Sequence, residues 1–414
     1  MSNLAHALRD ADWLNARRAH AYLVILAVIS AFVAAAYVSL SHRGLDPSGK
    51  ALGTDFASFW TASQLALEQR PDAAWRMDAH GAAQVARFGT QAGYAAFFYP
   101  PPFLLACLPL AMLDYPIALL LWLIVTGAAY TAMARAWLGP SFGLLPILAF
   151  PAVLVNAGHG QNGFLTAALL GGAISCNRRH PWLSGVLIGA LIIKPHLAVL
   201  APVFLILTRN GRGLAAAATT AIGLSALSWL AFGSAAWSQF IATSSIAGQT
   251  LEQDLIGYAK MQSVFAGARL IGAPLMLAWF LQAAAAIGAV AILWRIRQAE
   301  ATLLGAAFVC ATLLTTPFLL DYDLTVLAVP LAVLLRAGSE GHEGFRSWER
   351  LALGVGFILP LVARPMGILI CLPMTPFVVA ALLSLLLARA TTRVRAPVMA
   401  HPWQRSLTGA SSPN

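Results

Sequence analysis

Apolar stretches alternate with short polar joints along the whole chain. The pattern predicts an all-α membrane protein with about twelve spanning helices, although several runs are shorter than the roughly 20 residues that a straight crossing needs. Short runs interrupted by proline favour an interior cavity over a smooth bundle. The predicted spans are 21–40, 97–113, 116–137, 163–177, 182–194, 197–208, 213–232, 270–294, 301–318, 323–336, 351–364 and 366–388.

Residues 140–157 do not fit this alternation. They are apolar but contain Pro146 and Pro151. A full crossing here would place residues 158–163 on the wrong side of the membrane, given the spans before them. We therefore predict a broken helix that dips into the bilayer and returns, which is tolerated where protein buries the backbone.

The composition excludes a soluble protein. Of the 414 residues, 59% are hydrophobic and 10% charged, and the mean hydropathy is +0.74. The net charge of +10 comes from arginines in small groups between the spans. Such groups are typical of topology signals and not of a nucleic-acid site, so we expect no nucleic-acid partner. Sixteen of the 26 Lys and Arg residues fall on the side of both termini, which marks that side as cytoplasmic.

The spans divide the chain into a single membrane domain with two tails. We expect a cytoplasmic N-terminal tail at 1–20, the membrane domain at 21–388 and a disordered cytoplasmic tail at 389–414. The first apolar run is too long for a signal peptide and is interpreted as a retained span. The four cysteines lie in apolar runs without metal spacing, so neither a disulfide framework nor a metal site is expected.

The first loop beyond the membrane, residues 41–96, carries a candidate catalytic acid. Asp55 precedes a helical stretch, 56–69, whose apolar positions form a stripe suited to the membrane interface. A second helix is expected after Pro71, running to about Phe88. Asp55 can cap the first helix through its side chain or act as a base, and the two roles compete because a capping carboxylate is a poorer base. The stripe consists of Phe56, Phe59, Trp60, Ser63 and Leu67.

Lys194 interrupts an apolar run at Lys194-Pro195-His196. A lysine at mid-bilayer costs roughly 2.5–3.5 kcal/mol unless it is paired, hydrated or able to reach the surface. It can be a lysine that extends to the interface or a cation that binds phosphate. The predicted spans place other polar segments at the same level as Asp55: residues 158–163, 233–269 and 320–323.

The order of short motifs resembles glycosyltransferase family 87. The motifs are Thr54-Asp55-Phe56, Phe98 to Phe103 with its three prolines, Leu108-Pro109-Leu110, Gly160-Gln161-Asn162, Lys194-Pro195, Gln262-Ser263 and Pro317 with Tyr322-Asp323. The resemblance covers roughly residues 50–335. The family's enzymes are of the GT-C type, similar to the polyprenyl-phosphate-mannose-dependent mannosyltransferases of bacterial envelope synthesis. This chain departs from them after Pro317, where their histidine-containing stretch is replaced by Leu319 to Asp323.

The resemblance implies an inverting transfer of a hexose, with mannose the first choice, from a polyprenyl-phosphate donor. The acceptor would be an envelope lipid or glycan, and the active site would face the periplasm from the bacterial inner membrane. Asp55 would be the general base, with Asp321 and Asp323 as its rivals. Lys194 would bind the donor phosphate, ahead of Arg269 and Lys260. Candidates for sugar or acceptor contacts are Tyr99, His159, Gln161, Asn162, His196, Gln262, Asp321, Tyr322 and Asp323.

Other classes of protein fit less well. Asp321-Tyr322-Asp323 spells the D-x-D pattern of metal-dependent nucleotide-sugar transferases, but those enzymes need a soluble nucleotide-binding domain for which this chain has no room. We therefore expect neither metal nor other cofactor. The main alternative is a transporter or flippase, which is usually built from two related halves. The two halves of this chain share no motif, and its long first loop has no counterpart. A polysaccharide ligase or polymerase is a minor alternative.

Overall fold

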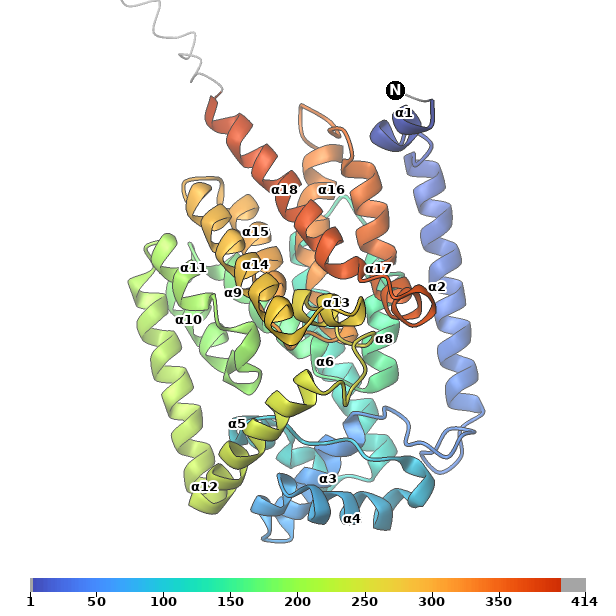
Figure 1. The fold of residues 1–414 in the computed structure, drawn as a ribbon, viewed down its shortest axis with the longest axis vertical. Helices are drawn as coiled ribbons and strands as arrows, with labels where there is room; N and C mark the ends of the chain where they lie inside the picture. Colours follow the sequence, from blue (N-terminus) through green and yellow to red (C-terminus); the bar gives the residue numbers. More distant parts are fainter. Residues whose placement is uncertain (1–2, 396–414) are drawn as a thin grey trace, which may run out of the picture.

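The computed structural model describes residues 3–395, and within this range the secondary structure is helical apart from three isolated bridges. Helix α1 and the end of α18 lie at one end of the molecule, called here the terminal end (Figure 1). Helices α3 and α4 lie at the opposite end, called the loop end (Figure 1). Both described ends of the chain are therefore at the same end of the molecule.

Seven segments of the described residues are long and apolar enough to cross a membrane. They are α2 (Ala16–Ser39), α6 (Tyr115–Leu138), α12 (Gly211–Glu252), α14 (Leu275–Arg295), η6 (Asp321–Leu327) continued by α16 (Ala328–Ser339), α17 (Glu349–Ile370) and α18 (Met374–Arg395).

Five shorter apolar segments complete the membrane domain. They are α5 (Pro101–Cys107) with η3 (Leu108–Met112), α9 (Gly163–Cys176), α10 (Pro181–Ala190) with η4 (Leu191–Ile193), η5 (Pro195–Leu197) with α11 (Ala201–Leu207), and α15 (Ala301–Thr315). The remaining elements are α1 (Asn3–Asp10), α3 (Phe56–Leu67), η1 (Pro71–Ala74), α4 (Met77–Phe88), η2 (Thr90–Ala92), α7 (Leu145–Leu148), α8 (Pro151–His159) and α13 (Val264–Leu270).

The chain between residues 97 and 159 runs differently from the prediction. Residues 97–113 do not cross, because the Trp60 indole donates to the Leu113 carbonyl (3.1 Å) and Tyr115 bonds to Leu52 at the loop end. Helix α6 then reaches the terminal end, where Arg336 donates to the Trp137 carbonyl (3.5 Å).

Helices α7 and α8 return the chain to the loop end, since the His159 ring lies 3.1 Å from the Thr54 hydroxyl. The predicted dip at 140–157 is therefore wrong, as is the crossing at 97–113. The two errors cancel, which is why residues 158–163 still lie at the same end as Asp55.

Helix α12 also differs from the prediction. The predicted span 213–232 is followed by a second helical part and not by a loop. Gly233, with φ of +77°, makes a kink between the two parts. Figure 1 shows α12 descending to the loop end and turning back toward α13.

The predicted break between residues 364 and 366 is absent. Helix α17 continues through Pro360 and Pro365 to Ile370. Helix α18 then continues to Arg395, past the predicted start of the disordered tail at 389. The guanidinium of Arg389 is buried against the carboxylate of Glu349, which binds this turn to α17. Residues 396–414 of the predicted tail lie outside the described residues.

Helix α3 is buried in protein instead of lying in the membrane interface. Phe56 and Phe59 of the predicted stripe are 0% and 1% exposed. The Phe59 ring packs edge-on against Phe103, with 4.9 Å between centroids. The aromatic stripe thus forms the loop-end core, because α5 and α6 cover it.

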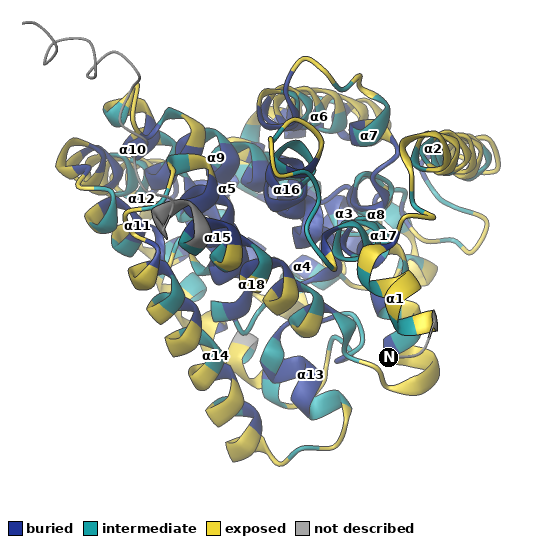
Figure 2. Ribbon diagram, turned by 90° about the horizontal axis from the view of Figure 1, so that it is seen from above, coloured by how far each residue is buried: buried dark blue, intermediate teal, exposed yellow. Residues whose placement is uncertain are grey.

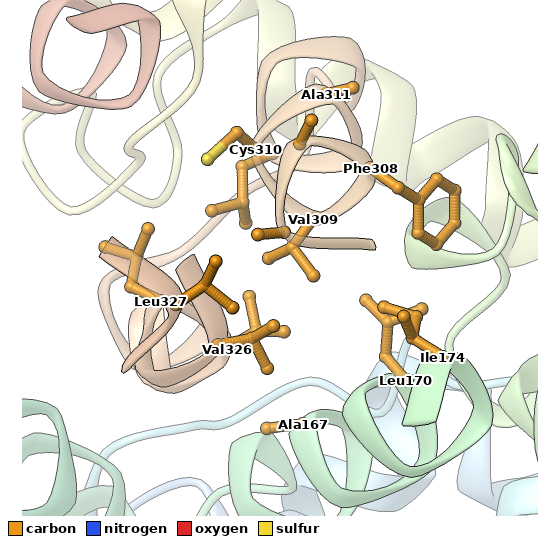
Figure 3. Close-up of a cluster of buried hydrophobic side chains, with 14 of the residues drawn as sticks. Ala167, Leu170, Ile174, Phe308, Val309, Cys310, Ala311, Val326 and Leu327 are labelled. Atoms are coloured by element: carbon orange, nitrogen blue, oxygen red, sulfur yellow. The ribbon is translucent and has the colours of Figure 1, made fainter. Parts of the chain in front are cut away.

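The main core lies where α9, α15 and η6 meet (Figure 3). Every residue of α15 from Leu303 to Leu314 is buried, as expected for a helix that is apolar on all sides. Figure 2 shows the exposed residues on the outer faces of α2, α12 and α14. Burial at the centre and apolar exposure outside fit a protein surrounded by lipid.

Helix α4 is held against α3 by a buried histidine. The His80 ring donates to the Ser58 carbonyl over 3.2 Å. Burial is the main cause that lowers the pKa of His80 from 6.5 to about 4; the Ser58 carbonyl opposes this shift and Arg87 adds to it. His80 is therefore neutral at pH 7.

We expect this contact to make the protein less stable in acid. A histidine whose pKa is lowered by folding contributes a free energy of stabilisation that is complete above pH 6.5 and is lost as the pH falls toward 4. The thermal midpoint of the purified protein in detergent, measured between pH 7 and pH 4.5, should fall more steeply for the natural chain than for His80→Gln. Equal slopes would contradict this role, because other groups titrate alike in both proteins.

Candidate functional site

Four segments meet at the loop end: the start of α3, the turn after α8, residues 258–263 and the start of η6. The Asp55 amide donates to the His159 carbonyl over 3.0 Å, which joins the first two segments. The backbone amide of Gln262 donates to the Leu319 carbonyl over 2.7 Å, and Met261 forms an isolated bridge with Leu320. These contacts join residues 258–263 to the start of η6. The polar segments that the sequence placed at one level are therefore in contact.

Two glycines allow the start of α3 to approach the turn after α8. Gly53 and Gly160 have φ of +62° and +61°. A Cβ on Gly160 would lie 2.6 Å from the Cβ of Phe56. The Trp122 indole donates to the Gly160 carbonyl over 3.1 Å. The glycine-rich turn is thus required by backbone packing within the protein.

The Asp55 carboxylate does not cap α3, because its side chain accepts no bond from the first turn. Its Oδ1 accepts from the Thr54 hydroxyl (3.4 Å) and lies 3.9 Å from His159 Nδ1. Its Oδ2 accepts from Gln161 Nε2 (3.2 Å) and lies 3.7 Å from Lys260 Nζ. The side chain is 20% exposed. These are long contacts, so the carboxylate keeps capacity for another hydrogen bond.

Gln161 connects Asp55 to Tyr99. Its Oε1 accepts from the Tyr99 hydroxyl (3.0 Å) and from the backbone amide of Asn162 (2.8 Å). These two bonds fix the orientation of the Gln161 side-chain amide, which directs its NH₂ group to Asp55. The predicted residues Tyr99, Gln161 and Asp55 therefore form one network.

His159 packs against the Tyr322 ring, with 5.9 Å between ring centroids. It is the last residue of α8. Its Nδ1 lies 3.9 Å from Asp55 Oδ1, whereas Lys260 Nζ lies 3.7 Å from Asp55 Oδ2.

The ammonium group of Lys194 is enclosed by protein. It is 3% exposed, forms an ion pair with Asp323, and donates to Asn162 Oδ1 over 3.1 Å. It also lies 4.9 Å from the centre of the Tyr322 ring. Asp323 accepts in turn from the Leu320 amide (3.1 Å). The break at Pro195 thus places a buried ion pair beneath the site.

Lys260 also lies near the Tyr322 ring. Its Nζ lies 5.6 Å from the centre of the Tyr322 ring, and its side chain is 17% exposed. The bridge between Met261 and Leu320 holds its backbone in place. Lys260 is therefore the more accessible of the two predicted lysines.

Three predicted residues make their contacts elsewhere. Arg269 donates to the Tyr258 hydroxyl (3.1 Å) and to the Ala273 carbonyl (2.8 Å). Gln262 accepts from the Thr375 hydroxyl (2.6 Å). The His196 ring lies 6.0 Å from that of Phe318. None of these contacts involves Asp55 or Tyr322.

A cavity of about 340 Å³ opens beside Asp55. Its lining includes Thr54 and His159, the two side chains next to Asp55 Oδ1, and Asp321. The lining also includes Arg364 from α17, which donates to Asp321 Oδ2 over 3.4 Å. Our sequence analysis missed Arg364, because it placed this residue at the joint between two predicted spans. The signal was present: an arginine within an apolar helix is a functional candidate.

Comparison with known proteins identifies the family. Residues 97–319, more than half of the chain, match glycosyltransferase family 87. The chain belongs to glycosyltransferase family 87. Neither the curated proteins nor the solved structures include a match to it. The family assigns a glycosyltransferase activity, with a sugar donor and an acceptor. The matched segment contains Tyr99, Gln161 and Lys194, whereas Asp55, Asp321 and Arg364 lie outside it.

The close approach of Gly160 to the start of α3 predicts that a larger residue at this position lowers the stability of the protein. Gly160→Ala introduces a left-handed alanine, which costs about 1–3 kcal/mol, and a clash with Phe56. We expect a clearly lower thermal midpoint in detergent. Gly158→Ala is the matched control, since a Cβ there has no neighbour within 4 Å. Equal midpoints for the two variants would contradict the close packing described here.

The two lysines should respond differently to removal of their charge. Lys194→Met leaves the buried Asp323 carboxylate without its partner, which typically costs about 3–5 kcal/mol. Lys260→Met removes a long, partly exposed pair that contributes roughly 0–1 kcal/mol. Denaturation of the purified variants should therefore show a large loss of stability for Lys194→Met alone. Equal losses would show that Lys194 is not the structural cation.

Proposed function

We propose that this protein is an inverting membrane glycosyltransferase that moves a hexose, with mannose the first choice, from a polyprenyl-phosphate donor to an envelope lipid or glycan. The observation that carries this proposal is the Asp55 carboxylate, uncapped and partly exposed, with the cavity lined by its neighbours Thr54 and His159. A general base must have access to the hydroxyl that it deprotonates. The Asp55 side chain is 20% exposed next to this cavity, which supports the role of base.

The reaction forms one bond and breaks another at the anomeric carbon. The acceptor oxygen attacks that carbon from the face opposite the phosphate, and its proton passes to Asp55. The bond between the anomeric carbon and the phosphate oxygen breaks, and the lipid phosphate leaves with the electron pair. One base is sufficient for this displacement, whereas a double displacement would also need a carboxylate as nucleophile.

Asp321 and Asp323 are less suited to be the base. Asp323 is 1% exposed and paired with Lys194, and Asp321 is 3% exposed and paired with Arg364. A proton accepted by either would weaken an ion pair that is largely removed from water. The proposal therefore keeps Asp55 as the base and gives the other two carboxylates positioning roles.

The enclosed position of Lys194 favours a structural role over binding of the donor phosphate. Lys260 is placed to stabilise the ionised form of Asp55, since Nζ lies 3.7 Å from Oδ2. Tyr99, Gln161 and His159 surround the carboxylate and supply hydrogen-bonding groups for the sugar or the acceptor. Arg269 and Gln262 keep their hydrogen bonds within the protein, and the His196 ring packs near Phe318, so none of the three is assigned to the substrate.

We assign the loop end to the periplasm of a bacterial inner membrane. The terminal end carries the buried ion pair of Arg389 and the exposed pair of Arg350 with Asp12. Arg336 lies there as well, bonded to the carbonyl of Trp137. An excess of arginine is typical of the cytoplasmic side, so the site at the other end would face the periplasm.

Radiolabel transfer tests this function. Purified protein in lipid nanodiscs receives decaprenyl-phosphate [¹⁴C]mannose, with membranes from cells lacking the gene as the source of acceptor. We expect a labelled product with inverted anomeric configuration. Asp55→Asn should lower the rate by about 10²- to 10⁴-fold, the range that a positioned base contributes.

Asp72→Asn is the matched control, because it removes a carboxylate from the same loop and, among the described residues, the ion pair found for Asp72 is with Arg76 at 3.6 Å. Its rate should equal that of the natural protein. Transfer by Asp55→Asn at the natural rate would exclude Asp55 as the base. Absence of transfer by the natural protein from decaprenyl-phosphate mannose and from the corresponding glucose donor would contradict the proposed donor class.

A further inference from the structure

We propose that Arg364 binds the phosphate of the lipid donor at the inner end of a groove between α2 and α17. The inference rests on the proposed function and names the donor-binding residue of that site. It assigns recognition of the phosphate to Arg364, which lines the cavity, and not to Lys194, which is enclosed. Arg364 lies outside the segment that matches the family.

Arg364 has donor capacity that the protein uses only in part. A guanidinium has five N–H donors. Among the described residues, the one hydrogen bond found for Arg364 is the 3.4 Å contact with Asp321. Arg389 shows the opposite arrangement: it bonds to both oxygens of Glu349 and to the carbonyls of Ala337 and Gly344. Arg389 is a structural arginine, whereas Arg364 can accept an anionic ligand.

The position of Arg364 fits the phosphate of a membrane lipid. It lies six residues before Ile370, the last residue of α17, which is about 9 Å along the helix axis. Its side chain is 41% exposed, and the other residues of α17 after Arg350 are apolar. A charge at such a depth is costly without a partner, and arginine binds phosphate through two parallel N–H groups.

The groove is apolar on both sides of the cation. Tyr37 of α2, Leu154 and Val155 of α8, and Pro360 and Leu361 of α17 line the cavity. No residue of α2 is buried, and its main neighbours are α7 and α8. Helix α2 stands at the edge of the molecule in both ribbon views (Figures 1 and 2). An arginine between apolar walls suits a ligand with a phosphate head and a hydrocarbon chain.

The groove also leads to the proposed base. Thr54 and His159 line the same cavity as Arg364 and contact Asp55 Oδ1. A phosphate on Arg364 would therefore leave the attached sugar on the side of Asp55. Departure of the lipid phosphate changes a diester with one negative charge into a monoester with up to two. A cation at this place stabilises charge that grows during the reaction.

Binding measurements without turnover test the assignment. The purified full-length protein in nanodiscs is titrated with decaprenyl phosphate, with decaprenol and with inorganic phosphate, and binding is followed by native mass spectrometry. The natural protein should prefer decaprenyl phosphate to decaprenol. Arg364→Gln should reduce this preference by about 10- to 100-fold, the loss expected for a hydrogen-bonded charge. Tight binding of inorganic phosphate alone would overturn the lipid as the ligand.

Three further variants separate ligand binding from stability. Arg76→Gln removes an exposed charge at the loop end whose ion-pair partner is Asp72, and it should keep the natural preference. Arg364→Lys keeps the charge but not the planar fork, so an intermediate preference is expected. Asp321→Asn releases the arginine and should keep or increase the preference. An equal loss in Asp321→Asn and Arg364→Gln, or an unchanged preference in folded Arg364→Gln, would overturn the proposal.

These results are independent of the proposed reaction. Phosphate preference with no sugar transfer would leave Arg364 as a lipid-phosphate site and reject the proposed activity. Sugar transfer with a natural donor KM in Arg364→Gln would keep the activity and reject Arg364 as the phosphate-binding residue.

Discussion

The buried ion pair between Lys194 and Asp323 is the interaction on which the site depends. The ammonium group also bonds to Asn162 and lies over the Tyr322 ring, so it joins the turn after α8 to the start of η6. Two charges removed from water are costly, and they are tolerated here because each has a second polar partner. The pair fixes the positions of the loops that place Asp55, His159 and Tyr322 together.

Lys194 of this pair and two further cations occupy different environments. Lys194 is enclosed, Lys260 is partly exposed beside Asp55, and Arg364 lines the cavity. In our proposal Lys194 holds the fold, Lys260 stabilises the ionised form of Asp55, and Arg364 binds the lipid phosphate. Both lysines lie near the Tyr322 ring, with Lys194 Nζ 4.9 Å and Lys260 Nζ 5.6 Å from its centre.

The sequence predicted the class of fold and the proximity of the polar segments better than the path of the chain. Apolar runs and arginine groups are direct consequences of the bilayer, so the helical membrane domain could be read from them. Whether residues 97–113 and 140–157 cross the membrane could not be read from the sequence, because short apolar runs have the same composition whether they cross or pack at one end. The buried stripe of α3 had the pattern of an interfacial helix for the same reason: lipid and protein interior are equally apolar.

Asp55, His159, Gln161 and Tyr322 were predicted to lie at one level because they are polar residues at the ends of apolar runs. The pairing of Lys194 with Asp323 joins residues 129 positions apart, and local spacing carries no information on such a contact. Arg364 was missed because it was placed at the joint between two predicted spans, whereas the helix continues through this position. An arginine within an apolar helical segment would have been the better guide.

The most direct test is a structure of the protein with a non-hydrolysable polyprenyl-phosphate sugar in nanodiscs. Our account predicts a phosphate within hydrogen-bonding distance of Arg364, about 3 Å, with the hydrocarbon chain between α2 and α17 and the anomeric carbon facing Asp55. A phosphate bound to Lys194 or Arg269, or a sugar remote from Asp55, would contradict it.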